Sequence, residues 1–191
     1  MRIIGGKYKG QRLNAPPGQN TRRTSDMIRE SIFNILSHRM DIKFMGMTVL
    51  DLYSGSGALG FEAFSRGAKK IIFIDKATRA IKCIKNNEKK FRNLDSFSIS
   101  QRDASFLPTR SYAEEPIDLV FLDPPYRKNL VTPTLMTLRE GEWLKVGAVV
   151  VAEMYKTDHY ELATNFSLSS ERNFGDTKVA FFSYDVTNQK G

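Results

Sequence analysis

The chain has 191 residues, of which 41% are hydrophobic, and its 29 Lys and Arg against 21 Asp and Glu give a formal net charge of +8. This length suffices for one domain with a self-supporting core, and the single cysteine, Cys83, excludes an internal disulfide framework and a zinc site built on a cysteine cluster. The longest apolar run, near residues 146–152, is too short to cross a bilayer and residues 1–10 contain no apolar signal-peptide core, so we expect a cytoplasmic monomer with no membrane or metal partner.

The first predicted element is a basic segment over residues 1–23. It contains no acid, and Tyr8 and several glycines are interleaved with its cations. This composition predicts a short hairpin, followed by a linker near Pro16 and Pro17. Concentrated positive charge is typical of a binding site for a polyanion such as a nucleic acid. The basic residues of the segment are Arg2, Lys7, Lys9, Arg12, Arg22 and Arg23.

The following elements alternate between helix and strand. Ile28, Ile32 and Ile35 recur at helical spacing and predict an amphipathic helix over 26–39. Further along, short runs that are almost entirely apolar predict strands buried on both faces, which is typical of a parallel sheet covered by helices. We expect strands at 48–52, 70–75, 97–101, 117–122 and 148–153, helices at 58–66, 77–92 and 132–139, and two weaker strands at 166–170 and 179–185.

The predicted fold is α/β, a doubly wound, mostly parallel Rossmann-like sheet with its core over about residues 45–185. No obvious helix separates the last two strands, so we expect an antiparallel hairpin at one edge. Residues 24–191 would form the main domain, with residues 1–23 as its basic extension. A second basic segment, 76–92, has seven Lys or Arg against the single Glu88. Its charge fits a solvated helix face and a nucleic-acid contact about equally well.

Four of the predicted strands end in or near an aspartate: Asp51, Asp75, Asp103 and Asp123. Each one alone is most simply a cap or a turn former. In such a sheet, however, ligands bind at the carboxyl ends of the strands. Four aspartates at that edge therefore predict a polar ligand site.

Residues 55–60 match the pattern G-x-G-x-x-G directly after a strand and at the start of a helix. The glycines permit a sharp turn and close approach of a ligand, and Asp75 lies at the sequence distance at which an acid binds ribose hydroxyls. The pattern predicts an adenosine-containing cofactor without separating NAD from S-adenosylmethionine. Asp51 favours the latter, because a carboxylate there would repel a pyrophosphate and suit a methionine ammonium group.

A second motif, Asp123-Pro124-Pro125-Tyr126, follows the strand at 117–122. The prolines restrict the backbone, which directs the Asp123 carboxylate and the Pro124 carbonyl into the cleft as two acceptors for a planar amino group. Tyr126 offers a ring on which a base can stack. Alone the motif could be an ordinary proline-terminated loop, but beside the glycine loop it indicates transfer of a methyl group to an amino group.

These segments resemble the nucleic-acid amino-methyltransferases, and more narrowly the bacterial 16S rRNA guanine-N2 methyltransferases of the RsmD type. Residues 1–10 are similar to that family's opening, 23–36 to its first helix, 50–60 to its cofactor loop and 120–126 to its catalytic loop. The chain departs from the family by having Arg22 before Arg23 and no proline after Arg23. This departure concerns the entry into the first helix, not the chemistry.

The resemblance implies methylation of the N2 amino group of guanine 966 in 16S rRNA of the small ribosomal subunit, with S-adenosylmethionine as donor and no metal. It places Asp51 at the methionine ammonium, Asp75 at the ribose, and Asp103 at the adenine. The implied catalytic residues are Asp123, Pro124, Pro125 and Tyr126, which orient the amino group and need not deprotonate it first. The implied cofactor-binding residues are Asp51, Ser54, Gly55, Ser56, Gly57, Asp75, Lys76, Asp103, Ala104 and Asp123, and the implied RNA-binding residues are the six cations of residues 1–23.

Other functions fit parts of the pattern. Methylation of adenine or cytosine in DNA uses the same 123–126 motif, but no large insertion for target recognition is visible. Protein glutamine methylation fits the basic N-terminus less well, and an NAD dehydrogenase would leave 123–126 without a role. A non-catalytic RNA-binding assembly module would leave the intact glycine loop and Asp123 unexplained. The preferred interpretation requires the loop at 123–126 to lie beside the pocket formed at 54–57.

Overall fold

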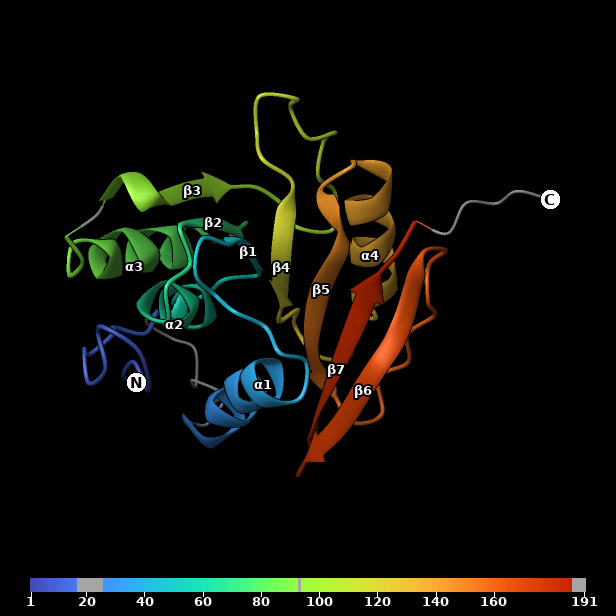
Figure 1. The fold of residues 1–191 in the computed structure, drawn as a ribbon, viewed down its shortest axis with the longest axis horizontal. Coiled ribbons are helices and arrows are strands. Elements are labelled where there is room, and N and C mark those ends of the chain that lie inside the picture. Colours follow the sequence, from blue (N-terminus) through green and yellow to red (C-terminus); the bar gives the residue numbers. More distant parts are fainter. Residues whose placement is uncertain (17–25, 93, 187–191) are drawn as a thin grey trace.

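The computed structural model describes residues 1–16, 26–92 and 94–186, and shows a single sheet flanked by helices (Figure 1). The predicted Arg22 and Arg23, and the boundary between the basic segment and the main domain, lie outside the described residues. The elements are α1 (Asp26–His38), β1 (Thr48–Leu52), α2 (Ala58–Ser65), β2 (Lys70–Asp75), α3 (Thr78–Glu88), a 3-10 turn (Leu94–Ser96), β3 (Phe97–Gln101), β4 (Ile117–Leu122), α4 (Val131–Glu140), β5 (Leu144–Tyr155), β6 (Phe166–Phe174) and β7 (Thr177–Tyr184).

The seven strands lie in the order β3-β2-β1-β4-β5-β7-β6. Strands β1 to β5 are parallel, β7 runs antiparallel to β5, and β6 runs antiparallel to β7. The chain therefore reverses its winding direction between β1 and β4, which is the point where doubly wound sheets bind ligands. The predicted fold class and the antiparallel edge hairpin are confirmed.

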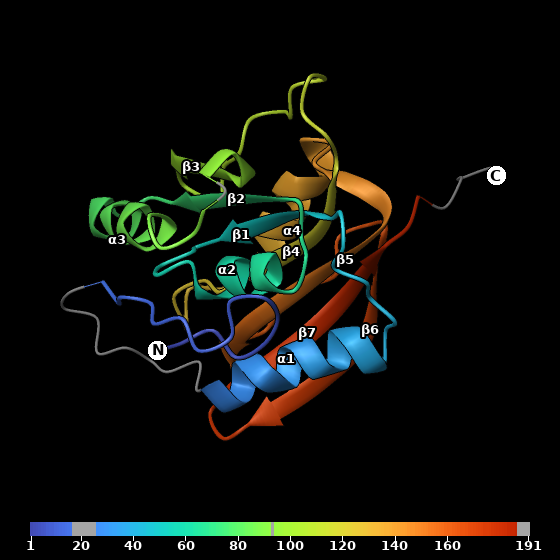
Figure 2. The ribbon, with the colours of Figure 1, turned by 60° about the vertical axis from the view of Figure 1, so that its left-hand side comes forward.

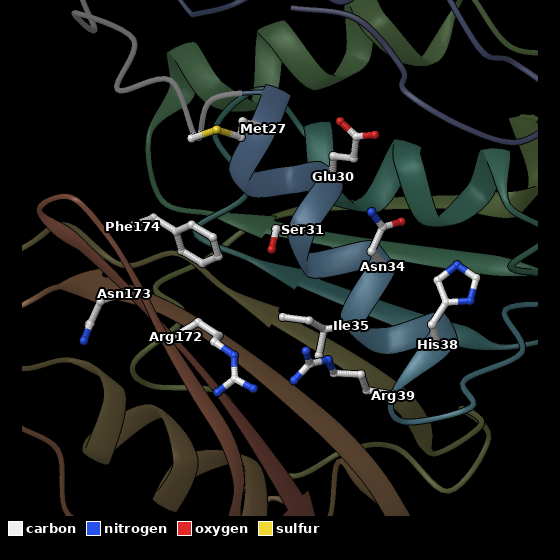
Figure 3. A pocket seen from close by; sticks show the side chains of 10 residues that line it. All are labelled: Met27, Glu30, Ser31, Asn34, Ile35, His38, Arg39, Arg172, Asn173 and Phe174. Atoms are coloured by element: carbon white, nitrogen blue, oxygen red, sulfur yellow. The ribbon is translucent and has the colours of Figure 1, made fainter.

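The β6–β7 hairpin is longer than predicted and extends the sheet past α1 (Figure 2). Most residues of β6 are exposed or half-buried, so this edge strand lacks the continuous apolar run that marks the central strands. A cleft separates β6 from α1 (Figure 3). The sequence pattern predicted the hairpin but neither its full length nor the cleft beside it.

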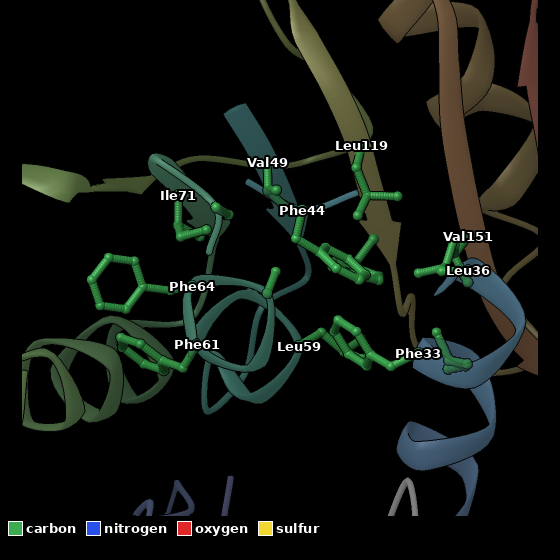
Figure 4. Packing of buried hydrophobic residues seen from close by; sticks show 14 of the residues in the cluster. Phe33, Leu36, Phe44, Val49, Leu59, Phe61, Phe64, Ile71, Leu119 and Val151 are labelled. Atoms are coloured by element: carbon green, nitrogen blue, oxygen red, sulfur yellow. The ribbon is translucent and has the colours of Figure 1, made fainter. Parts of the chain in front are cut away.

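Each face of the sheet has its own hydrophobic core. Val49 belongs to one core and Leu50 to the other, as the alternation of side chains along a strand requires. The first core contains apolar residues of α1, α2 and α3 and is rich in phenylalanine, with Phe33 of α1 and Phe61 of α2 fully buried (Figure 4). The second core is covered by α4. Both faces of the central strands are thus closed, which leaves the strand ends for a ligand.

The N-terminal segment folds back on itself and packs against α2. An isolated antiparallel bridge joins Arg2 to Arg12, and the segment buries Ile3 and Leu13 in the first core. The carboxylate of Glu62 in α2, which is itself fully buried, accepts hydrogen bonds from the backbone N–H of residues 4 and 5 at 2.7 and 2.8 Å. The described part of the predicted hairpin arm is therefore integrated into the core of the main domain.

Candidate functional site

The two sequence motifs leave the same edge of the sheet from neighbouring strands. In the parallel pair β1–β4, Leu52 lies opposite Leu122, and the Asp123 N–H donates to the Leu52 carbonyl at 3.5 Å. The loop at 53–57 and the loop at 123–126 therefore start side by side at the carboxyl ends of their strands. The two loops thus leave the same edge of the sheet, which the predicted site requires. The four strand-end aspartates follow the strand order β3-β2-β1-β4 as Asp103, Asp75, Asp51 and Asp123.

The glycine loop combines a left-handed turn with a close helix–strand contact. Gly55 and Gly57 have φ values of 55° and 77°, and Gly57 is the N-cap of α2. A Cβ atom at Gly60 would lie 2.4 Å from Phe73 Cε1, so only glycine lets α2 pack this closely on β2. The first two glycines shape the loop and the third fits the helix against the sheet.

Asp51 is a buried carboxylate directly below this loop. It is 2% exposed, and its Oδ2 accepts a hydrogen bond from the Gly60 N–H at 2.9 Å. Burial raises the pKa of Asp51 to about 8; the hydrogen bond from Gly60 opposes the shift, and the nearby Asp75 charge adds to it. Within the described part of the chain no ion pair neutralises Asp51. The site therefore fits a cationic group, which would offset the cost of ionising this carboxyl.

We expect Asp51→Asn to stabilise the ligand-free protein increasingly as the pH rises. Because the pKa of Asp51 in the folded protein lies above its ordinary value of 3.8, the unfolded state loses this proton first and stability falls from about pH 4 to about pH 8. The substitution removes this loss, so its advantage in unfolding free energy should grow by about 2–4 kcal/mol between pH 5 and pH 8.

Urea unfolding at the two pH values measures this difference. Asp118→Asn, which removes a carboxylate from the opposite edge of the sheet, controls for the change of charge. If Asp51→Asn raised the unfolding free energy by the same amount at both pH values, Asp51 would not be a carboxyl with a raised pKa.

Asp75 and Ser54 fasten the glycine loop to β2. Asp75 Oδ2 accepts a hydrogen bond from the Gly55 N–H at 2.9 Å, and Oδ1 accepts one from the Ala77 N–H at 2.8 Å. The Ser54 hydroxyl donates to the Ile74 carbonyl at 3.0 Å and to the Asp51 carbonyl. Each Asp75 oxygen keeps a second lone pair for a ligand hydroxyl, so Asp75 can both hold the loop and bind there.

The remaining predicted cofactor residues lie on either side of Asp75, with Lys76, Asp103 and Ala104 after β2 and β3 and Ser56 in the glycine loop after β1. Lys76 forms an ion pair with Asp103 at 3.2 Å, and hydrogen bonds from the side chain and backbone of Ser105, with smaller contributions from Lys76, lower the pKa of Asp103. Asp103 is therefore an ionised, accessible acceptor, while the neighbouring Ala104 is buried. On the other side, the Ser56 carbonyl accepts a hydrogen bond from the fully buried Asn87 at 3.0 Å.

The loop at 123–126 is positioned by residues that the sequence did not single out. The Tyr126 hydroxyl lies 2.7 Å from Thr177 Oγ1 and donates to Glu153 Oε1 at 3.2 Å. Pro124 is buried, whereas Pro125 is exposed and Asp123 and Tyr126 are half-buried. Glu153 could have been noticed, because it ends the fifth predicted strand as the aspartates end theirs. Thr177 gave no signal, since its role depends on the hairpin turning back to this edge.

The predicted RNA-binding cations lie on the integrated N-terminal segment. Those within the described residues are all exposed: Arg2, Lys7, Lys9 and Arg12. The segment also reaches the glycine loop, because the Ser56 hydroxyl donates to Met1 Sδ at 3.2 Å. The basic surface and the strand-end site thus adjoin each other. No helix in the described ranges is long and apolar enough to span a membrane.

The geometry agrees with comparisons to known proteins. A family model described as "Conserved hypothetical protein 95" matches residues 1–183. A Bacillus subtilis protein provisionally described as an rRNA methyltransferase is 34% identical over 95% of this chain and 98% of its own length. The ribosomal RNA small subunit methyltransferase D of Escherichia coli is 30% identical over 99% of this chain and 92% of its own length.

Among solved structures, an Escherichia coli protein provisionally described as a methyltransferase superposes with a TM-score of 0.82 at 27% identity, covering 98% of this chain and 99% of its own. The two motifs, the sheet order and these matches agree over nearly the full length. The chain therefore belongs to the family described as Conserved hypothetical protein 95, the RsmD family of methyltransferases.

Proposed function

We propose that this protein transfers a methyl group from S-adenosylmethionine to the exocyclic N2 amino group of a guanine in 16S rRNA of the small ribosomal subunit. One observation carries the proposal: the glycine loop and the Asp123 loop begin side by side, at the carboxyl ends of the neighbouring strands β1 and β4. Relatives named as small-subunit rRNA methyltransferases support the RNA substrate. We further propose that the protein acts as a cytoplasmic monomer.

The residues at the edge suit S-adenosylmethionine. Asp51 offers a buried carboxylate for the methionine ammonium, Asp75 offers acceptors for the ribose, and Asp103 offers one for the adenine amino group. Bound there, the cofactor supplies a methyl carbon on a positively charged sulfur. The backbone of residues 54–57 would line the methionine end of the pocket, while Lys76 and Ala104 would flank the adenine.

The chain's own contribution to the reaction is orientation and electrostatic stabilisation. A target guanine must leave its stack to present N2, and Tyr126, held by Thr177, provides a ring for it to stack on. The Asp123 carboxylate and the Pro124 carbonyl each accept a hydrogen bond from the amino group. These two bonds orient the nitrogen lone pair toward the methyl carbon. As the N–C bond forms and the S–C bond breaks, positive charge develops on N2. Asp123 stabilises that charge until a proton leaves to water.

The proposal is tested by transfer of labelled methyl from S-adenosylmethionine to small-subunit particles that lack the modification. We expect label in 16S rRNA at one guanine, identified as N2-methylguanine by nuclease mapping and mass spectrometry. Fully modified particles are the matched control and should take up none. Label in DNA adenine or cytosine would favour the DNA enzyme, and a rise in melting temperature with S-adenosylmethionine but no transfer to any nucleic acid would contradict the proposed reaction.

A further inference from the structure

A cleft of about 600 Å³ lies between α1 and β6, and none of the residues that line it belongs to the strand-end site. One wall consists of side chains on α1 and the residue after it, including Ser31, Asn34 and Arg39 (Figure 3). The other wall is the end of β6, with Arg172, Asn173 and Phe174. None of these residues belongs to a motif predicted from the sequence.

The two arginines make the cleft electropositive. Arg39 and Arg172 extend toward each other from opposite walls (Figure 3), and neither forms an ion pair with any carboxylate of the described residues. Arg29 and Arg66, by contrast, are paired with acids on their own helices. Arg172 donates one hydrogen bond to the Glu171 carbonyl at 2.7 Å, which leaves most of its five donors available. Two unpaired guanidinium groups facing one space are suited to a phosphate.

The cleft opens next to the loop proposed to hold the target base. Phe174, at its rim, pairs with Thr177 across the β6–β7 hairpin, and Thr177 Oγ1 is 2.7 Å from the Tyr126 hydroxyl. A chain of direct contacts therefore leads from the cleft to residues 123–126. A nucleic-acid strand whose base occupies the Tyr126 site would therefore lie near the Phe174 end of the cleft.

The cleft also lies on the same side of the sheet as the basic N-terminal segment. Helix α1 and the N-terminal residues share the first hydrophobic core, and Arg29 of α1 donates to the Arg2 carbonyl at 2.6 Å. Helix α1 therefore contacts the N-terminal segment that carries the exposed cations and also forms one wall of the cleft. Phosphate contacts of this kind set the register of a bound nucleic acid without reading its sequence.

We propose that the cleft between α1 and β6 binds the sugar-phosphate backbone of the RNA beside the target nucleotide, with a phosphate between Arg39 and Arg172. The amides of Asn34 and Asn173 lie on either wall to bond phosphate or ribose oxygens. Glu30, the one acid among the lining residues, disfavours a second phosphate at its end of the cleft. This inference rests on the proposed rRNA substrate and adds a contact that fixes how that substrate lies.

The test compares R39Q/R172Q with K43Q/K145Q, which removes two exposed cations that do not line the cleft. Binding to small-subunit particles lacking the modification is measured between 50 and 200 mM KCl, together with the KM for the particles, the Kd for S-adenosylmethionine and the melting temperature. For R39Q/R172Q we expect roughly tenfold weaker binding and a salt slope reduced by about 0.7–0.9, as for the loss of one phosphate contact, together with a raised KM and an unchanged cofactor Kd and melting temperature.

A salt slope and a KM equal to those of the Lys variant would overturn the cleft proposal while leaving the methyltransferase proposal intact. Absence of methyl transfer by the unmodified protein would contradict the proposed function instead, and the binding measurement would still report on the cleft because it needs no turnover. A weaker cofactor Kd or a lower melting temperature in R39Q/R172Q would show that these arginines support the fold, which also overturns the proposal.

Discussion

Asp123→Ala is expected to reduce methyl transfer by about 10²–10³-fold or more, while S-adenosylmethionine still binds. The carboxylate would be the acceptor that orients the guanine amino group and the negative charge nearest to N2 as positive charge develops there. Removing it leaves one of the two proposed acceptors, the Pro124 carbonyl. Asp51 and Asp75, which lie on other strands, keep their places for the cofactor.

Single-turnover transfer and equilibrium binding of S-adenosylmethionine separate these two effects. Asp123→Asn is the matched variant: it preserves one acceptor oxygen but presents N–H groups to the amino hydrogens, so we expect activity between that of the alanine variant and that of the unmodified protein. Near-normal turnover in Asp123→Ala would remove Asp123 from the mechanism. Loss of cofactor binding in the same variant would assign it to the cofactor pocket rather than to orientation of the amino group.

The central part of the fold follows from the sequence because burial on both faces leaves a clear pattern. Strands β1 to β4 are found at the predicted residues. Strands β1, β2 and β4 are short, largely apolar runs, whereas the edge strand β3 alternates apolar Phe97 and Ile99 with polar residues. The predicted lengths of the two antiparallel strands are too short. Strand β6 is polar over most of its length, and its pairing with β7 depends on contacts that no local pattern encodes.

Site contacts between residues that are close in sequence could be predicted. Contacts between residues that only the fold brings together could not. Asp51 and Gly60 belong to one strand–loop–helix unit, so the motif reveals them together. The contact between Tyr126 and Thr177 spans 51 residues, and its existence depends on where the hairpin turns. The packing of the N-terminal segment was likewise not predicted. Its charge suggested a separate arm, whereas Ile3 and Leu13 lie in the core.

Glu62→Ala is expected to destabilise the protein by about 3–5 kcal/mol, the usual cost of removing one partner of a buried charge network. The Glu62 carboxylate is fully buried and accepts three hydrogen bonds, from Ile4 N–H, Gly5 N–H and Arg66 Nε at 2.7, 2.8 and 2.9 Å. Without it, two backbone donors and a guanidinium group lose their acceptor in a space that water does not readily enter. Urea unfolding measures the loss, and hydrogen exchange at residues 4 and 5 locates it.

Glu62→Gln controls for size, because it retains one acceptor oxygen, and it should cost less than the alanine variant. Equal stability of Glu62→Ala and the unmodified protein would mean that the N-terminal segment is held by its apolar contacts alone.

The expected loss of stability also determines how the RNA-binding role of the N-terminal segment can be tested. Deleting residues 1–23 would remove Ile3 and Leu13 from the core and take from the buried Glu62 its two backbone donors, so weaker RNA binding by a truncated chain could reflect unfolding. Replacing Arg2, Lys7, Lys9 and Arg12 by glutamine removes the charge while keeping the backbone bonds to Glu62, so a flatter salt dependence in that variant would report on RNA contact.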